Sequence, residues 1–324
     1  MIRPARMLAR RAAAARGLAS AATAADTRVG LVGLGKMGSQ FAINLVCAGY
    51  DVTAYDASAG AVAVAVANGA AGAASPAEVA AASPVVITML PNDAVLRAVV
   101  DGGLLAAMQP GGLHVSCSTI APGTARELAA EHGAQGSAYV GAPIFARPDG
   151  VTARQGSFAV GGAAAAVARA RPLLETSATG VFEFGEDPGA GNVVKLCGNF
   201  LIAAAIESIS ESLTLAEKNG VDRVKVMEMM SSTIFDCLIY KSYGERVSKR
   251  LHDPKPTNFG LELGLKDVTL VLDTAHKSGV PMPVGSVLHD RYLQSLARGR
   301  GELDWSAIGL SVAEDAGLEP VSEG

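Results

Sequence analysis

The chain has 324 residues, 49% of them hydrophobic and 18% charged, so it holds enough apolar material for two globular domains. Its formal net charge of −4 gives no electrostatic basis for binding nucleic acid. The four cysteines are widely scattered and form no metal-like pair, and no apolar run is both long enough and free enough of charge to predict a bilayer span.

The first 25 residues differ in composition from the rest of the chain. They contain five arginines, no acidic residue and mostly alanine otherwise, which is typical of an organellar transit peptide. Residues 1–25 are therefore set aside from the fold, and import into the mitochondrial matrix is expected. The alternative is a disordered tail, with the protein then cytoplasmic. Removing the five arginines would change the formal charge from −4 to −9.

A short apolar strand predicted over residues 27–33 runs directly into a G-x-G-x-x-G sequence, and a helix is predicted over 39–48. In such a unit Gly33 permits a tight turn, Gly35 lets the backbone approach a pyrophosphate, and Gly38 allows close packing of helix and strand. The helix N-terminus then faces the phosphates with free N–H groups and a partial positive charge. This context predicts a dinucleotide-binding site.

The next predicted strand, over residues 50–56, ends at Asp56, 18 residues after the last glycine of the loop. A carboxylate at this place accepts hydrogen bonds from the adenosine ribose and repels a 2′-phosphate. The following residues are Ala57 and Ser58, where an NADP site usually places arginine. The sequence therefore predicts NAD, and a glycine-rich turn with a purely packing role does not explain Asp56.

Strands and helices continue to alternate up to residue 184, with the last two strands predicted over 158–160 and 181–184, and this alternation predicts a doubly wound α/β sheet. Such sheets bind ligands beyond the carboxyl ends of their strands. Leu90 and Pro91 follow a predicted strand at 84–89, and Ser118 and Thr119 follow another at 113–116. These four residues are expected to line the binding cleft, although turn chemistry alone would explain each of them singly.

Residues 189–219 form one long apolar stretch that predicts a helix between two bodies of the protein. Lys195 and Asn199 are four residues apart and so lie on one face of this helix. The lysine either faces a cleft or reaches solvent. Only helices are predicted after this point: a short one capped by Asp222, a long one over 261–278 and another over 284–298. The chain therefore divides into a dinucleotide-binding domain at 26–188 and a helical domain at 189–324.

Six motifs occur in a fixed order: the glycine loop with Met37, M-L-P at 89–91, S-T at 118–119, G-A-P at 141–143, G-x-x-x-K-x-x-x-N at 191–199 and K-D at 266–267. In this order they resemble the β-hydroxyacid dehydrogenase family, which includes 3-hydroxyisobutyrate dehydrogenase and glyoxylate/succinic semialdehyde reductase. The resemblance covers residues 28 to about 308. It implies a Rossmann domain, a long interdomain helix and a helical domain that often mediates dimerisation, so a homodimer or homotetramer is expected.

The resemblance also implies roles for single residues. Lys195 matches the family's catalytic lysine, Asn199 the residue that positions substrate and lysine, and Ser118 a substrate contact. A lysine in a desolvated cleft suits the transfer of the hydroxyl proton while hydride moves to or from nicotinamide. The expected cofactor-binding residues are Gly33, Leu34, Gly35, Lys36, Met37, Gly38, Asp56, Leu90, Pro91, Thr119 and Lys266.

One segment departs from the family pattern. Family members commonly carry Ser-Gly-Gly after Ala-Pro-Val, whereas this chain has Phe145, Ala146 and Arg147. A guanidinium can replace the lost anion-binding donors with a bidentate geometry. We therefore expect Arg147 to bind the substrate carboxylate and Phe145 to narrow the pocket. The alternative is that Arg147 points to solvent on a rigid loop.

The sequence thus predicts hydride transfer between NAD and a small 3-hydroxy acid, with a small carboxylate as the only partner besides other copies of the chain. The alternative is an NADPH-dependent reductase of glyoxylate or succinic semialdehyde, which Asp56 disfavours. Imine reductases generally lack the lysine. A noncatalytic Rossmann binding module is the remote alternative, because chromatin-binding members of the family lose the lysine and carry basic additions.

Overall fold

The computed structural model describes residues 27–252 and 259–318. The arginine-rich segment at 1–25 lies outside the described residues. The chain forms two compact units, Met1–Lys195 and Leu196–Gly324, and the division falls inside the long helix α10 (Ala190–Lys218). Each unit is described separately below.

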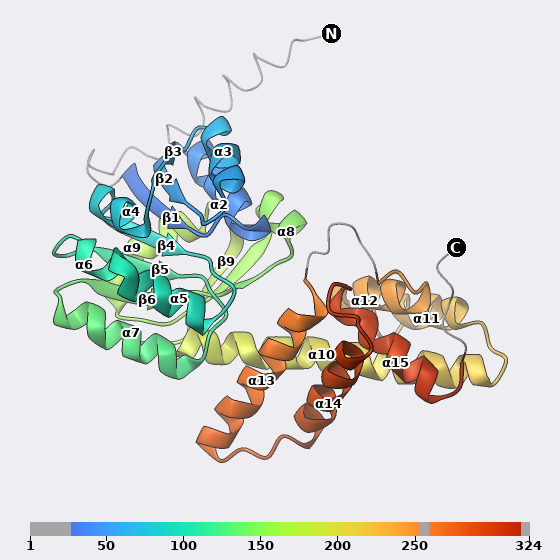
Figure 1. Cartoon of the computed structure of the whole chain (residues 1–324). Coiled ribbons are helices and arrows are strands. Elements are labelled where there is room, and N and C mark those ends of the chain that lie inside the picture. The colour runs from blue at the N-terminus through green and yellow to red at the C-terminus, as the bar shows by residue number, and fades with distance from the viewer. Residues whose placement is uncertain (1–26, 253–258, 319–324) are drawn as a thin grey trace, which may run out of the picture. The chain divides into compact units, whose positions relative to one another are not determined.

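Six parallel strands form the main sheet of the first unit, in the order β3-β2-β1-β4-β5-β6 (Figure 1). This order is that of the doubly wound dinucleotide-binding fold, so the predicted fold class is confirmed. The strands are β1 (Arg28–Val32), β2 (Asp51–Tyr55), β3 (Ala71–Gly72), β4 (Val85–Thr88), β5 (Leu113–Ser116) and β6 (Ala138–Gly141).

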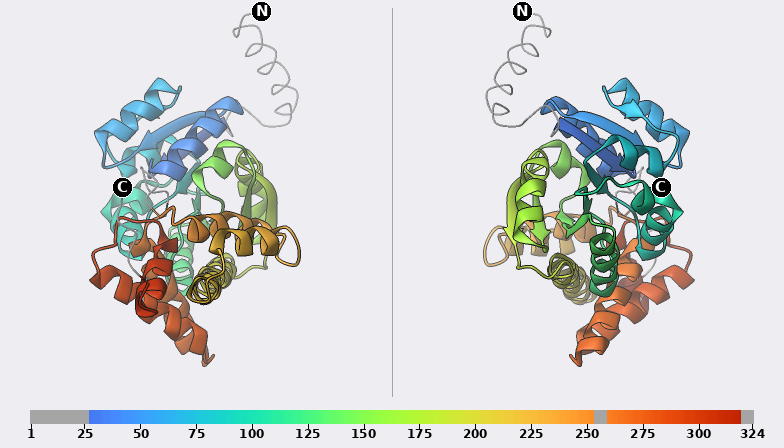
Figure 2. Two further views of the ribbon diagram at one scale, coloured as in Figure 1. Left: turned by 90° about the vertical axis from the view of Figure 1, so that its right-hand side faces the viewer. Right: turned by 90° about the vertical axis from the view of Figure 1, so that its left-hand side faces the viewer.

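Helices pack on both faces of this sheet (Figure 2). Successive strand residues point to opposite faces, so Leu31 packs in the core with Phe41 of α2 (Lys36–Cys47), whereas Val32 packs with Val79 of α4 (Pro76–Ala82). The helices of this unit are α2 (Lys36–Cys47), α3 (Ala59–Ala67), α4 (Pro76–Ala82), α5 (Asp93–Val99), the π-helical turn η2 (Val100–Leu104), α6 (Leu105–Ala107), α7 (Pro122–Ala134), α8 (Pro148–Thr152) and α9 (Ala164–Leu174).

A second, smaller sheet follows in the same unit. It consists of β7 (Ile144–Phe145), β8 (Gly156–Val160) and β9 (Ala178–Glu183). β7 is antiparallel to β8, and β8 is parallel to β9. The sequence pattern predicts β8 and β9 but not β7, because two residues are too few for an alternating pattern to show.

The second unit is helical, as the sequence predicts. Apolar residues of α10 at helical spacing, among them Ala203, Ile206 and Leu213, pack in one core with Leu288 and Trp305. In the part of the chain that the structure describes, α10 is the one helix long and apolar enough to cross a membrane, so the expectation that no apolar run meets this test is wrong. The contacts above show that its apolar residues contribute to a protein core.

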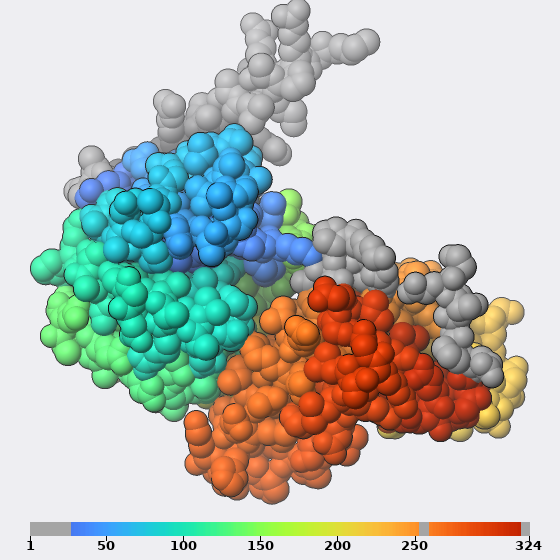
Figure 3. Space-filling model, in the orientation of Figure 1, coloured from blue at the N-terminus to red at the C-terminus, as the bar shows by residue number. Residues whose placement is uncertain are grey.

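The other helices of this unit are α11 (Arg223–Ser231), α12 (Leu238–Ser248), α13 (Leu261–Ser278), α14 (Pro283–Ala297), the 3₁₀ turn η3 (Trp305–Ala307) and α15 (Ile308–Asp315). α14 packs against both α13 and α15, and the surface of these residues is coloured orange to red in Figure 3.

Candidate active site

Two of the three loop glycines are required by the fold itself. Gly33 has a φ of +98°, and a Cβ there would lie 2.4 Å from the carbonyl oxygen of Met89. A Cβ on Gly38 would lie 1.9 Å from the carbonyl oxygen of Gly33. Gly35 differs, because its φ of −60° suits any residue and a Cβ there would meet no described atom within 4 Å. The described fold does not require glycine at this position, so Gly35 leaves room for the close approach of a ligand such as the predicted pyrophosphate.

The N-terminus of α2 is open to an anion. The helix begins after Gly35, which supplies no side-chain cap, and the first turn, fully described, contains no acidic residue. The first backbone N–H groups of a helix lack partners within the helix and carry a partial positive charge. In this turn Lys36 is exposed and Met37 is half-buried. Leu34, which precedes the turn, is buried. These features fit the phosphates of a dinucleotide.

Asp56 holds the glycine loop to the end of β2. The backbone N–H of Leu34 donates to Asp56 Oδ2 at 2.6 Å, and that of Ser58 donates to Oδ1 at 2.8 Å. This structural role is not evident from the sequence. An ionised carboxylate has about four lone-pair sites, so Asp56 retains acceptors for ribose hydroxyls.

The ends of β1, β4 and β5 are neighbours at one edge of the sheet, as predicted. The backbone N–H of Leu90 donates to Ser118 Oγ at 2.8 Å, and Leu90 also lies against Gly33. Ser118 is 2% exposed, Thr119 is half-buried and Pro91 is exposed. The structure therefore brings Leu90 and Ser118 together with the glycine loop, and it gives Ser118 a role in joining two strand ends.

Two residues that the sequence does not single out hold the segment after Ser118. The backbone N–H of Ile120 donates to Oδ1 of Asn192, which is fully buried, at 3.2 Å. The N–H of Ala121 donates to Asp93 Oδ1 at 2.9 Å. The signal for Asn192 is a polar residue directly after Gly191 in an apolar helix.

The beginning of α10 is positioned by glycines. A Cβ on Gly191 would lie 2.3 Å from the carbonyl oxygen of Ala159 in β8, and side chains on Gly141 and Gly161 would equally collide with the backbone just before Gly191. These glycines let α10 approach the carboxyl end of β6 closely. Lys195 lies one helical turn later, at the same edge of the sheet as the glycine loop.

Lys195 and Phe145 are in direct contact within the first unit. Lys195 Nζ lies 4.3 Å from the centroid of the Phe145 ring. Both side chains are half-buried. Arg147, two residues further along, precedes α8 at its N-cap position and is also half-buried.

In the second unit, Asn199 is held by a carboxylate. Asn199 Nδ2 donates to Asp267 Oδ2 at 2.5 Å, and Lys266 Nζ lies 2.9 Å from Asp267 Oδ1. Asp267 is 2% exposed, so its charge is compensated mainly by these contacts. Because the amide of Asn199 donates to the carboxylate, its oxygen is oriented as an acceptor. Asn199 and Lys195 lie one turn apart on the same face of α10.

Two family models match the chain. The NAD binding domain of 6-phosphogluconate dehydrogenase matches residues 28–185, and a domain described as NAD-binding of NADP-dependent 3-hydroxyisobutyrate dehydrogenase matches residues 189–310. Together they cover both units. A nicotinamide cofactor follows from these matches, and it agrees with the fit of the glycine loop to a pyrophosphate.

Relatives of similar length match most of the chain. An uncharacterized oxidoreductase, YfjR, of Bacillus subtilis is 32% identical over 283 residues, which cover 87% of this chain and 98% of the relative. The 3-hydroxyisobutyrate dehydrogenase of Pseudomonas aeruginosa is 35% identical over 300 residues, covering 87% and 97%.

Among solved structures, Mycobacterium tuberculosis 3-hydroxyisobutyrate dehydrogenase with L-serine superposes with a TM-score of 0.80 and 31% identity, covering 88% of this chain and 99% of the other. The chain therefore belongs to the β-hydroxyacid dehydrogenase family, oxidoreductases that act on CH–OH groups with NAD(P).

Proposed function

We propose that this protein is an NAD-dependent dehydrogenase of a small 3-hydroxy acid of the 3-hydroxyisobutyrate type, with Lys195 as its general acid and base. The observation that supports the proposal is the close docking of α10 through Gly191, one helical turn before Lys195, against Ala159 of β8 and Gly141 of β6. Similarity to a 3-hydroxyisobutyrate dehydrogenase solved with L-serine, itself a 3-hydroxy acid, supports the substrate class.

When bound, the nicotinamide supplies the hydride chemistry. In oxidation, the neutral amine of Lys195 takes the proton of the substrate hydroxyl. In reduction, the ammonium form donates a proton to the carbonyl oxygen. A positioned acid or base of this kind contributes a factor of about 10²–10⁴ to the rate.

The other site residues are proposed to hold the substrate. Ser118 Oγ accepts from Leu90 and keeps its own hydroxyl proton to donate. Asn199, oriented by Asp267, is proposed to position the substrate and Lys195. Arg147 is proposed to bind the substrate carboxylate through its planar guanidinium, and Phe145 to narrow the pocket.

The cofactor preference is proposed from Asp56. Its carboxylate lies beside the glycine loop, where it would repel a 2′-phosphate, and Ala57 supplies no compensating charge. The remaining cofactor contacts are proposed for the residues of the glycine loop and for Leu90, Pro91, Thr119 and Lys266. The double variant Asp56→Ala, Ala57→Arg should move the preference toward NADP, and a higher kcat/KM for NADP in the unmodified enzyme would contradict the proposal.

The experiment that tests the function is a screen of NAD and NADP reduction with 3-hydroxyisobutyrate, 3-hydroxypropionate, serine, threonine and 4-hydroxybutyrate. We expect turnover of at least one 3-hydroxy acid with NAD and a loss of kcat by ~10²–10⁴ in Lys195→Ala. NAD affinity should change little in that variant. Failure of every substrate, or near-normal turnover by Lys195→Ala, would refute the proposal.

Location and assembly are also proposed. The arginine-rich residues 1–25 would be removed on import into mitochondria, and residues 26–188 and 189–324 would serve as cofactor and helical domains of a homodimer or homotetramer. Mass spectrometry of the native N-terminus and light scattering of the purified protein test these points. An intact Met1 on cytosolic protein, or a monomer, would contradict them.

A further inference from the structure

The contact between Lys195 and Phe145 arises from the segment in which this chain departs from its family's pattern. Where the resemblance leads us to expect Ser-Gly-Gly, the chain carries an aromatic ring, and the structure places that ring 4.3 Å from Lys195 Nζ. The face of an aromatic ring is negative and attracts a cation within about 6 Å of its centroid. The ring therefore interacts more strongly with the ammonium form of Lys195 than with the neutral amine.

Both partners of this contact are fixed by regular structure within one unit. Phe145 lies in β7, where it is paired with Ser157 of β8, and its neighbour Ile144 is paired with Phe158 and buried. The backbone of Lys195 is fixed by the close docking of α10 onto β8. The ring and the ammonium group are thus held by the same three-stranded sheet, and substituting the ring should leave the lysine backbone in place.

Charged groups flank the elements that carry the contact, and Asp149 in the first turn of α8 is one of them. Arg126 of α7 and Asp187 form an ion pair with each other at 2.7 Å at the beginning of α10, and Arg147 follows β7. Their charges are the same in the wild type and in any variant of Phe145. A difference between such variants therefore reports the ring itself.

We propose that Phe145 is a positioning residue that holds Lys195 in its ammonium form and so moves to higher pH the point at which carbonyl reduction slows and alcohol oxidation becomes fast. The inference rests on the proposed role of Lys195. In reduction, an N–H bond of Lys195 breaks and an O–H bond forms on the substrate, while hydride from the reduced nicotinamide forms the C–H bond. The lysine remains as a neutral amine and regains its proton from water. In oxidation the ring opposes the first step, because that step requires the neutral amine.

The test is the pH dependence of kcat/KM in both directions for the wild type, Phe145→Leu and Phe145→Tyr. Loss of the ring should move the inflection by about 0.5–1 pH unit to lower pH in both directions. Phe145→Tyr keeps the ring and should retain the wild-type profile.

A matched control is Phe182→Leu, the same substitution at an exposed phenylalanine of β9 in the same small sheet, and it should leave the profile unchanged. Phe145→Met removes the ring with a similar side-chain volume and serves if the leucine variant is unstable. An unchanged inflection in both ring-less variants, or an equal shift in Phe182→Leu, would overturn the inference.

A second measurement separates this inference from the proposed function. Titration of Lys195 by NMR of ¹³C-labelled lysine, assigned through Lys195→Arg, requires no turnover. A lower titration point in Phe145→Leu, in a protein that oxidises no hydroxy acid, would support the ring–lysine contact and refute the proposed function. An unchanged titration point in an active dehydrogenase would refute the inference alone.

Discussion

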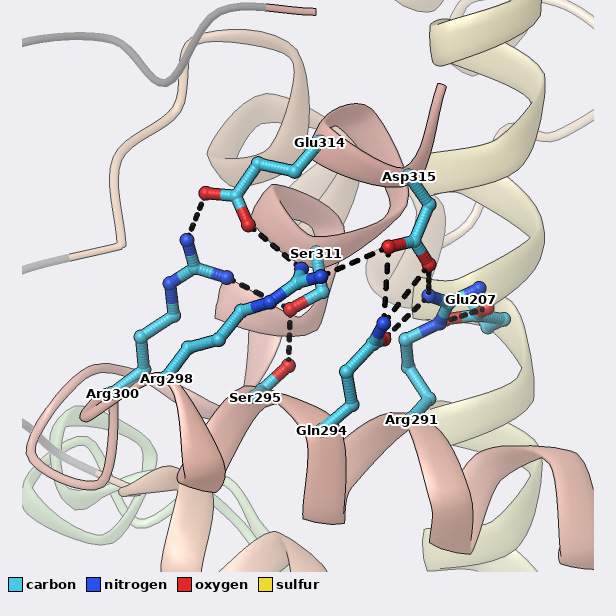
Figure 4. Close-up of polar contacts among 9 residues, drawn as sticks. All are labelled: Glu207, Arg291, Gln294, Ser295, Arg298, Arg300, Ser311, Glu314 and Asp315. Carbon is cyan, nitrogen blue, oxygen red and sulfur yellow. Dashed lines mark hydrogen bonds and ion pairs between the residues drawn. The ribbon is translucent and has the colours of Figure 1, made fainter. Parts of the chain in front are cut away.

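The two units bury their polar side chains in different ways. In the core of the first unit, a chain of neutral hydrogen-bonding groups joins Thr88, His114, His132 and Ser137 at 2.9 Å per link. In the second unit, ion pairs join α10, α14 and α15, among them that of Arg291 with buried Glu207 (Figure 4). One chain can therefore provide partners for its buried polar groups in two ways. Hydrogen bonds between neutral groups are broken when a histidine is protonated, whereas ion pairs are broken when one charged partner is removed.

The hydrogen-bond directions in the first unit follow from one contact. The Ser137 hydroxyl donates to the carbonyl oxygen of His132, so its oxygen accepts from His132 Nδ1. His132 Nε2 then accepts from His114 Nδ1, and His114 Nε2 accepts from the hydroxyl of Thr88. Every member is satisfied with both rings neutral. Burial holds the pKa of His114 well below its usual range and lowers that of His132 to about 4.

The second unit relies on charge. Glu207 of α10 is 6% exposed, and its Oε1 accepts from Arg291 Nε at 2.8 Å. Arg291 NH1 also donates to Asp315 at 2.5 Å. Figure 4 shows Arg298 and Arg300 of the same network reaching the carboxylates of α15. Despite Arg291, burial raises the pKa of Glu207, so the carboxylate depends on its partner to remain charged.

The largest expected effect is a loss of stability of the first unit when a glycine that contacts the backbone is substituted. Neither hydrogen bonds nor ion pairs between side chains can relieve such a clash. In Gly38→Ala the new Cβ would lie 1.9 Å from the carbonyl oxygen of Gly33, and we expect a loss above about 4 kcal/mol in that unit. Two probes separate the units: labelling of the buried Cys117 reports the first, and fluorescence of the single tryptophan, Trp305, reports the second.

Gly35→Ala is the matched control for that variant. Because a Cβ at Gly35 meets no described atom within 4 Å, stability should change by about 1 kcal/mol or less, while the affinity for NAD should fall. If Gly38→Ala is as stable as the wild type, the close approach is not required. If Gly35→Ala binds NAD normally, the ligand explanation for Gly35 is wrong.

The next largest effect is a loss of stability of the second unit when one partner of a buried ion pair is removed. Arg291→Met removes the partner of buried Glu207, and leaving a buried charge unpaired costs about 3–5 kcal/mol. Glu207→Gln should cost less, because Arg291 keeps Asp315 and the amide oxygen can still accept from it. Urea unfolding followed by Trp305 fluorescence measures both. Equal losses in the two variants would show that burial of Glu207 does not govern the network.

The same contrast explains how much could be predicted from the sequence. The first unit follows from the period-two strand pattern, the glycine spacing and the strand-end residues, which depend on local geometry. Phe145 and Lys195 were singled out separately, yet their contact depends on the pairing of β7 with β8, which no local pattern shows. Asp267 and Asn192 act on residues distant in the sequence, so their roles required the structure.

The helical unit was less predictable in detail. The limits of α13 were predicted to the residue, because apolar residues recur at helical spacing between Gly260 and Gly279. α12 and α15 were not predicted. Several residues of α15 are satisfied only by distant partners: Ser311 bonds Ser295, and Asp315 bonds Arg291. A short helix stabilised by such partners leaves little signal in its own sequence.

A smaller expected effect is the loss of stability of the two units in acid. The unfolded pKa of histidine is about 6.5, so between pH 6.5 and about 4 the unfolded chain binds protons that buried His132 does not. The contribution of such a histidine to the free energy of unfolding is therefore fully present above pH 6.5. Below pH 6.5 the free energy of unfolding falls by roughly 1.4 kcal/mol per pH unit for each such histidine.

The first unit contains two of these histidines, and the second contains one, His252, whose pKa burial lowers to about 4. The first unit should thus lose stability about twice as steeply with acid. Urea unfolding at several values of pH checks this, with a pyridyl disulfide labelling Cys117 and fluorescence reporting Trp305. A steeper loss in the helical unit would reverse the comparison.

The smallest expected effect is the loss of stability when an exposed arginine of the second unit's ion pairs is removed. Arg298→Met is the same substitution as Arg291→Met, at the C-cap of the same helix, but the Arg298 side chain is 34% exposed, against 17% for Arg291. Its carboxylate partners Glu314 and Asp315 each keep another arginine, Arg300 and Arg291 respectively. We expect a loss of about 0.2–1 kcal/mol, as for exposed ion pairs.

Salt should distinguish the two arginine variants further. Exposed pairs are screened at 1 M salt, where the Debye length is about 3 Å, whereas buried pairs are screened much less. The difference between Arg298→Met and the wild type should therefore disappear in 1 M NaCl, while that for Arg291→Met should persist. If both differences disappear, Glu207 is reached by solvent, and the second unit does not depend on a buried charge in the way that its contacts indicate.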